Sequence, residues 1–322
     1  MFVPLSPVPS HVSPDSTGPG PITLLFGGDC LLAGSYEEAT GDAAGYAFRD
    51  FDLLRRADVS MVNLESPVTR RGRRVPKPFN FRAHPRIVSA LLEAGIDIVN
   101  LANNHIYDYG AQGLFDTILY LDSLGLQHVG AGRNSAEAYH PVIRVVNGRR
   151  VGFLGYYGGG EAPGATRNSP GVARREIMRI QEGVHLLRER DSVTYVVVNL
   201  HWGTELADHP DSDQVAFAHD VIDAGANAVI GHHPHVLQGI ELYDKGVIAY
   251  SLGNLLFGGS SRSSYDTGLF EIRLHGDSTS YAFVPVRVEQ WSLGLPDSAA
   301  GARLLGRMGQ LSSQFPNSIF HK

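Results

Sequence analysis

The sequence predicts an α/β fold built on mixed sheets. Apolar runs that end in polar residues recur along the chain, and each is typical of a buried strand: ITLLFGGD (22–29), DVSMVNLE (58–65), IDIVNLANNH (96–105), TYVVVNLHWG (194–203) and NAVIGHHPH (227–235). Amphipathic helical patterns lie between them, at 85–94, 110–124, 174–190 and 213–224. Strands that alternate with helices indicate an α/β sheet.

Other segments predict antiparallel pairs, so the sheets are expected to be mixed. VIRVVNGRRVGFLGYY (142–157) places Asn-Gly at 147–148 between two apolar runs, which is a strong hairpin signal. The segments 239–257 and 267–290 resemble it. No internal repeat or linker interrupts residues 21–292, which we predict to form one catalytic domain.

The two ends differ from this central domain. Residues 1–20 hold five prolines and no Lys or Arg, which predicts a flexible tail and no secretory signal. Residues 293–322 are expected to form a C-terminal helix, near 298–311, followed by a polar tail. Because no segment has the length of an apolar membrane span, we expect no membrane insertion and a cytoplasmic location.

Composition narrows the classes of function. The formal net charge of −6 argues against a nucleic-acid partner. The one basic stretch, TRRGRRVPK (69–77), is interpreted either as a solvated loop or as a small rim that attracts anions. The single cysteine, Cys30, excludes an internal disulfide framework and fits a reducing compartment. Its simplest interpretation is a buried apolar thiol.

The predicted strand ends carry groups that bind divalent metals. The stretch GHHPHV (231–236) is one of five such ends, which carry Asp29, Glu65, Asn104 with His105, His201, and His233 with His235. In an open α/β sheet the C-terminal strand ends share one edge, where ligands bind. Mixed nitrogen and oxygen ligands suit Mn, Fe, Co or Zn better than Ca or Mg. His232 is expected to pack or hydrogen-bond instead of binding metal.

The order of the motifs resembles a known family. GD, NLESP, LANNHIYDYG, LHWGTE, GHHPH and YSLGN occur in the order seen in the CapA family of poly-γ-glutamate capsule biosynthesis proteins, which is similar to calcineurin-type metallophosphoesterases. The resemblance covers residues 22–257. It implies a four-layer αββα sandwich of two mixed sheets flanked by helices, with a dinuclear metal cleft at the sheet edges.

The resemblance also implies roles for these residues and a cofactor of one or two divalent transition-metal ions (Mn, Zn or Fe). Site one would use Asp29, Glu65 and His235, and site two would use Glu65, Asn104, His201 and His233, with Glu65 bridging the ions. The usual Asp-x-His motif is here Asp29-Cys30-Leu31, and the bridging residue is Glu in place of Asp. Site one therefore has fewer protein ligands, and we expect it to be weaker or empty.

The candidates for catalysis are His105 and Asp108. By resemblance, His105 would act as a general acid or stabilise the leaving group. Asp108, three residues later, could orient its imidazole or instead cap the helix at 110–124.

Four further residues are substrate-binding candidates. Asn80 and Arg82 resemble the family's Asn-Phe-Arg element, although a surface salt bridge would also explain Arg82. Ser251 and Asn254 lie in a Gly-containing turn, where they would line the cleft or only shape the turn.

Three functions remain open from the sequence. The first is a hydrolase in which a metal-activated water attacks a phosphate ester or an acyl or amide centre of an anionic small molecule. The second is a CapA-type accessory role in the synthesis of poly-γ-glutamate or a related γ-glutamyl amide, although the typical N-terminal membrane anchor is not expected here. The third is a metal-stabilised protein that binds anions without turnover. The oligomeric state is left open.

Overall fold

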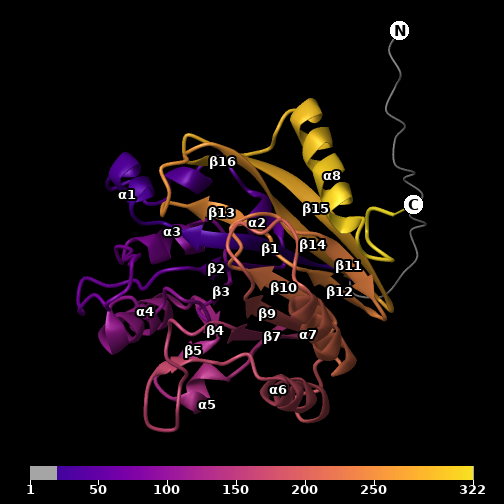
Figure 1. Cartoon of the computed structure of the whole chain (residues 1–322), viewed down its shortest axis with the longest axis horizontal. Helices are drawn as coiled ribbons and strands as arrows, with labels where there is room; N and C mark the ends of the chain where they lie inside the picture. The colour runs from indigo at the N-terminus through magenta and orange to yellow at the C-terminus, as the bar shows by residue number, and fades with distance from the viewer. Residues whose placement is uncertain (1–19, 322) are drawn as a thin grey trace.

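The chain forms two facing sheets with helices on their outer sides (Figure 1). The computed structural model describes residues 20–321. The first sheet runs in the order β16 (Ser292–Gly294), β15 (Ser278–Glu289), β14 (Tyr265–His275), β1 (Ile22–Leu31), β2 (Val59–Leu64), β3 (Ile98–Asn100) and β4 (Gln127–Val129). β1 to β4 are parallel, whereas β14 to β16 are antiparallel to their neighbours.

The second sheet is also mixed. Its order is β11 (Ile240–Tyr243), β12 (Gly246–Ala249), β10 (Ala228–His232), β9 (Tyr195–His201), β7 (Arg149–Tyr157) and β6 (Val142–Val146). β7, β9, β10 and β12 are parallel, and an antiparallel strand closes each edge. A small pair, β5 (Ala131–Gly132) and β8 (Gly171–Val172), lies outside both sheets.

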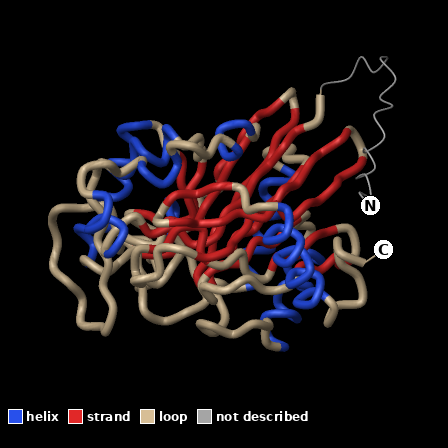
Figure 2. Tube along the Cα trace, turned by 90° about the horizontal axis from the view of Figure 1, so that it is seen from above, coloured by secondary structure: helices blue, strands red, loops and turns tan. Residues whose placement is uncertain are grey.

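Helices complete four layers, as the view in Figure 2 also indicates. The helices of the first half of the chain are α1 (Ser35–Thr40), a 3₁₀ turn (Tyr46–Phe48), α2 (Leu53–Arg56), α3 (Ile87–Glu93), α4 (Gly110–Leu124) and α5 (Ser135–Ala138). Those of the second half are α6 (Ile177–Glu189), α7 (Ser212–Asp223) and α8 (Ser298–Ser312). α3 and α4 cover the first sheet, and α6 and α7 cover the second. The predicted mixed-sheet αββα sandwich is therefore confirmed.

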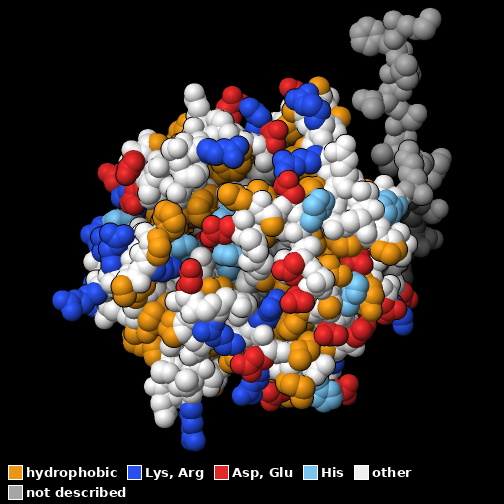
Figure 3. All heavy atoms as spheres, in the orientation of Figure 1, with side chains coloured by type: hydrophobic (Ala, Val, Ile, Leu, Met, Phe, Trp, Pro, Cys, Tyr) orange, Lys and Arg blue, Asp and Glu red, His pale blue; other side chains and the backbone are white. Residues whose placement is uncertain are grey.

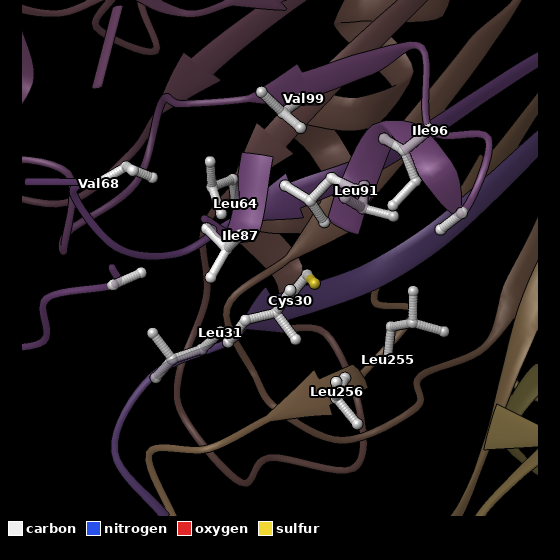
Figure 4. Packing of buried hydrophobic residues seen from close by; sticks show 14 of the residues in the cluster. Cys30, Leu31, Leu64, Val68, Ile87, Leu91, Ile96, Val99, Leu255 and Leu256 are labelled. Carbon is white, nitrogen blue, oxygen red and sulfur yellow. The ribbon is translucent and has the colours of Figure 1, made fainter. Parts of the chain in front are cut away.

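Three apolar layers hold the sandwich together, because alternate strand residues face opposite sides of each sheet. Between the sheets, Phe26 and Met61 pack with Phe153 and Val197. A second cluster lies under α3 and α4; Figure 4 shows Cys30 there among leucine, isoleucine and valine side chains. Burial raises the pKa of the Cys30 thiol to about 12. A reactive thiolate is therefore disfavoured at this position.

The observed hairpins explain why the sheets are mixed. Asn147 and Gly148 both have positive φ, 48° and 76°, as a two-residue type I′ turn between β6 and β7 requires. The segment 239–257 is only partly the antiparallel pair predicted for it. β11 and β12 pair antiparallel, but β13 (Asn254–Phe257) crosses to the first sheet and pairs parallel with β1. Residues Ser251–Gly253 carry the chain from the second sheet to the first, which a short apolar run could not reveal.

The C-terminal helix α8 lies along one edge of the sandwich (Figure 1). Its Leu304, Met308 and Leu311 are buried in the layer between the sheets. The predicted tail over residues 1–20 falls, except for Gly20, outside the described residues. Within residues 20–321, no helix combines the length and apolar character needed to cross a bilayer.

Candidate metal centre

The two carboxylates of the centre come from neighbouring parallel strands. Asp29 lies near the end of β1, at a shift in its register with β2, and Glu65 directly follows β2. Both side chains are fully buried. Asn63 Nδ2 donates hydrogen bonds to Asp29 Oδ1 (2.8 Å) and to Glu65 Oε2 (3.1 Å). One buried amide therefore orients both carboxylates toward the same space.

The histidines arrive from the second sheet. His201 ends β9, and His233 and His235 follow β10. His235 Nδ1 lies 3.1 Å from Asp29 Oδ2, and its Nε2 lies 3.7 Å from Glu65 Oε1. His201 Nε2 lies 3.7 Å from the same Glu65 oxygen. His233 and His235 have φ of 99° and 59°, so this loop stores backbone strain at the centre.

These residues form two potential ligand sets that share Glu65. One set is Glu65, His201 and His233, the other is Asp29, Glu65 and His235, and within each the ligand atoms lie no more than 4.8 Å apart. Asn104 Oδ1 lies 2.9 Å from His201 Nε2, beside the first set. Glu65 Oε1 and His233 Nδ1 are buried without a hydrogen-bond partner among the described residues. A divalent cation fits this arrangement because it would satisfy such atoms.

A third set, Glu205, His233 and His235, also has its ligand atoms within the same spacing. Glu205 is exposed, whereas the two histidines are partly buried. From the sequence, Glu205, four residues after His201, could orient a ligand or simply be a loop carboxylate.

The pKa values of the two buried carboxylates are shifted in opposite directions. Burial raises the pKa of Glu65 well above its usual range, and the nearby Asp29 charge adds to this effect. Burial would also raise the pKa of Asp29, but the hydrogen bond and charge of His235 outweigh it and hold that pKa below its usual range. Burial, together with the charge of His233, keeps the pKa of His201 well below 6.5, so its imidazole stays neutral, the form that binds metals.

A histidine–carboxylate pair adjoins the centre. His105 Nδ1 lies 2.8 Å from Asp108 Oδ2, and both side chains are buried. Lys77 Nζ lies 2.6 Å from Asp108 Oδ1 and donates to the Asn104 carbonyl (2.8 Å). Asp108 contacts His105, while the N-cap position of α4 is Tyr109, which makes no side-chain cap. The pair is thus held in one orientation by a buried ion pair.

The sequence of this chain is similar to those of bacterial capsule synthesis proteins. The family model "Bacterial capsule synthesis protein PGA_cap" matches residues 23–259, which include every candidate ligand. The chain belongs to this capsule synthesis family. The capsule biosynthesis protein CapA of Bacillus anthracis is 33% identical over 286 residues, or 84% of this chain and 68% of that protein. The PGA biosynthesis protein CapA of Bacillus subtilis is 31% identical over 279 residues, or 84% and 72%.

A solved structure agrees with the fold of this family member. The NAD nucleotidase of Haemophilus influenzae superposes with a TM-score of 0.51 at 11% identity. The match covers 93% of this chain and 57% of that chain, so the family member spans little more than half of the enzyme chain. This likeness concerns the fold alone.

The Asn-Phe-Arg element, residues 80–82, contacts the histidine–carboxylate pair through its central residue, Phe81. Asn80 accepts a hydrogen bond from Arg74, and the Arg82 guanidinium lies 4.6 Å from the centre of the Tyr109 ring. Phe81 packs against the His105 ring at 4.5 Å, and its N–H donates to Asp108 Oδ2 (2.6 Å). Neither Asn80 nor Arg82 contacts the candidate ligands, so their substrate role stays a prediction.

The family's YSLGN motif supports the histidine loop. Asn254 Oδ1 lies 2.9 Å from His235 Nδ1. Ser251 donates to the Val236 carbonyl and accepts from the Gly253 N–H, so it shapes the turn. His232 is buried, outside the three ligand sets, and its Nδ1 lies 3.8 Å from Asp29 Oδ1. Burial lowers its pKa to about 4.

Sequence reasoning missed the buried amides and Lys77. Asn100 and Asn103 donate to Asn63 Oδ1, which fixes the amide that orients both carboxylates. A signal was present, because Val-Asn-Leu recurs at 62–64, 99–101 and 198–200, each at the end of a buried strand. Lys77 had no such signal, since it is one of several cations in a polar loop. On the face drawn in Figure 3, histidine, acidic and basic side chains reach the surface near the middle.

Proposed function

We propose that this chain is a metal-dependent hydrolase acting on a phosphate ester or an acyl or amide bond of an anionic small molecule. The single observation that carries the proposal is the buried Glu65 carboxylate, which belongs to two ligand sets and has an unpartnered Oε1. Asp29, Glu65 and His235 would hold one ion. Glu65, Asn104, His201 and His233 would hold the other.

The donor atoms suggest the kind of ion. Imidazole nitrogens mixed with carboxylate and amide oxygens favour Mn, Zn or Fe. When bound, two such ions lower the pKa of a water molecule and neutralise charge on a phosphoryl or carbonyl centre.

His105 is placed to move a proton. Asp108 occupies Nδ1, and within residues 20–321 the other ring nitrogen, Nε2, has no hydrogen-bond partner. Nε2 could therefore exchange a proton with the leaving group. The Phe81 ring packs against the imidazole and limits its rotation. Asn104, the preceding residue, contacts His201, so the acid and the ligands belong to one rigid assembly.

A second candidate is an accessory role in making a γ-glutamyl polymer without hydrolysis. The names of the two Bacillus relatives, capsule biosynthesis and PGA biosynthesis proteins, favour it. The same names favour a γ-glutamyl amide over a phosphate ester as the substrate of a hydrolase.

The test is a turnover assay with Mn²⁺ or Zn²⁺ on aryl phosphate mono- and diesters and on γ-glutamyl anilides. We expect His105→Ala to lower kcat by about 10²–10⁴-fold, the usual contribution of a general acid. His185→Ala is the matched control, because His185 is exposed on α6. Turnover unchanged in His105→Ala would refute the proton-transfer role. Metal-loaded protein that binds these compounds but turns over none of them would favour the accessory role.

A further inference from the structure

A small pocket opens beside His233, one of the candidate ligands. Its volume is about 80 Å³, and it is lined by Tyr157, Gly158, Gly159, Arg175, Trp202, Gly203 and His233. Arg175 is not among the candidate metal ligands or the candidate catalytic residues. A group bound in this pocket would lie next to the metal centre, because His233 borders both.

The Arg175 guanidinium has aromatic neighbours but no anionic partner. It lies 4.6 Å from the centre of the Phe217 ring and 5.8 Å from that of Trp202. Among residues 20–321 its side chain makes no hydrogen bond or ion pair. Asp211 and Asp213 act on it only as more distant charges. A half-buried cation without a partner is costly, and an anion in the pocket would offset this cost.

Neighbouring arginines are already engaged. Arg174 donates to the carbonyls of Gly159 and Ala162, and Arg179 pairs with Glu182 at 3.2 Å. Arg307, in another pocket that borders His235, pairs with Asp208 at 3.3 Å. Of these four, Arg175 is the one whose side chain makes no hydrogen bond or ion pair within residues 20–321.

Glycines keep the pocket open. A Cβ added to Gly158 would lie 3.1 Å from Arg175 Nε, and one added to Gly159 would lie 2.3 Å from the Tyr157 hydroxyl. Gly203 has φ of +85°, which few other residues adopt. A side chain at Gly158 would therefore contact the guanidinium itself, and one at Gly159 would collide with the Tyr157 hydroxyl.

We propose that Arg175 anchors an oxyanion of the substrate, a carboxylate or a phosphate, in this glycine-lined pocket. The planar guanidinium presents paired N–H donors that match two oxygens of either group. The contact with the Phe217 ring restricts the movement of the guanidinium before the ligand arrives. The link to turnover rests on the proposed hydrolase function, whereas anion binding does not depend on it.

The binding test uses Trp202 as a reporter in metal-free protein. The chain has two tryptophans, so the substitution Trp291→Phe leaves Trp202 as the single fluorescent reporter. Trp291 itself lies in a different apolar cluster from Trp202. This protein is titrated with sodium phosphate and with sodium glutarate at constant ionic strength. We expect a saturable change in fluorescence with at least one of them, and the one that binds more tightly identifies the oxyanion.

Variants in the Trp291→Phe background assign the response. Arg175→Gln should weaken binding roughly tenfold or more, corresponding to about 1.4 kcal/mol. Arg175→Lys should weaken it less, because it keeps the charge but loses the paired donors. Arg179→Gln, in the helix α6 that begins two residues after Arg175, should leave it unchanged. No saturable response to either anion, or equal affinity in Arg175→Gln, would overturn the proposal even if the protein proves to be a hydrolase.

With a substrate that is turned over, Arg175→Gln should raise KM at least roughly tenfold and leave kcat nearly unchanged. A variant that lost only stability would instead show a lower Tm with unchanged KM. Turnover with unaltered KM would contradict the anchoring role without affecting the hydrolase proposal.

Discussion

At the residue scale, Lys77 balances the charge beside His105. Its ammonium contacts Asp108 and the Asn104 carbonyl, and its side chain is only 11% exposed. Asp108 is fully buried, so Lys77 is the cation that offsets the cost of burying its charge.

Lys77→Met should therefore lower both stability and turnover. We expect a loss of about 3 kcal/mol in the free energy of unfolding, because a buried carboxylate is left without its cation. Urea denaturation and kcat measured together check this. Lys77→Arg should retain most of both properties, and Arg73→Met, an exposed change in the same loop, should alter neither. A Lys77→Met protein with normal stability would show that Asp108 does not need this partner.

His232 gives a pH-dependent prediction for the metal-free protein. Its folded pKa of about 4 lies below the ordinary 6.5, so the unfolded chain binds the proton more readily. The stability that this residue contributes is complete above pH 6.5 and is lost as the pH falls toward 4. The loss is on the order of 2–3 kcal/mol.

His232→Gln removes this titration. Relative to the variant, the wild-type protein should lose stability between pH 7 and pH 4.5, as measured by urea denaturation. Parallel stability profiles for the two proteins would contradict the lowered pKa.

At the scale of elements, the close approach of β1 to the turn before β13 places Asp29. The Asp29 N–H donates to the Gly253 carbonyl at 2.8 Å. A Cβ added to Gly28 would lie 1.9 Å from that carbonyl oxygen. Gly28 is therefore required by the packing of one backbone against another.

Gly28→Ala should separate β1 from this turn and displace Asp29 from His235. We expect a loss of at least about 2 kcal/mol in the free energy of unfolding and weaker binding of one metal ion. Calorimetry with Mn²⁺ measures both effects. The control is Gly294→Ala in β16, where an added Cβ meets nothing within 4 Å. Equal stability of the two variants would show that the turn can move away at little cost.

Elements with strong periodicity were predictable, and short or irregular ones were not. The pattern at 110–124 coincides with α4, and the Asn-Gly pair marks the hairpin turn of β6 and β7. Strand ends also predicted which histidines and carboxylates gather, because parallel strands share an edge. β13 has four residues and no signal for the sheet it joins. Lys77 and Arg175 depend on how loops fold back, which local sequence does not encode.

At the scale of the whole molecule, the centre lies where the two sheets meet. The carboxylates come from the first sheet and the histidines from the second. Metal binding is therefore expected to stabilise the contact between the sheets.

The two ions should be held unequally. Site one offers Asp29, Glu65 and His235, whereas site two offers Glu65, Asn104, His201 and His233. After mild chelation we expect elemental analysis to find one ion retained per chain. Asp29→Asn should leave that ion in place, and His201→Ala should release it. Two ions retained equally by the wild-type protein would contradict this asymmetry.

The crossing of β13 between the sheets also bears on the order of folding. The strand pairs with the N-terminal β1, although in the sequence it follows every strand of the other sheet. Contacts so distant in sequence close late and slow the folding reaction. The N-terminal half emerges first during synthesis, so β1 can pair with β2 before β13 and the histidines have been made. Because Asn254 contacts His235 and pairs with Asp29, we expect the newly made chain to acquire an ion at site one only after residues 254–257 have been made.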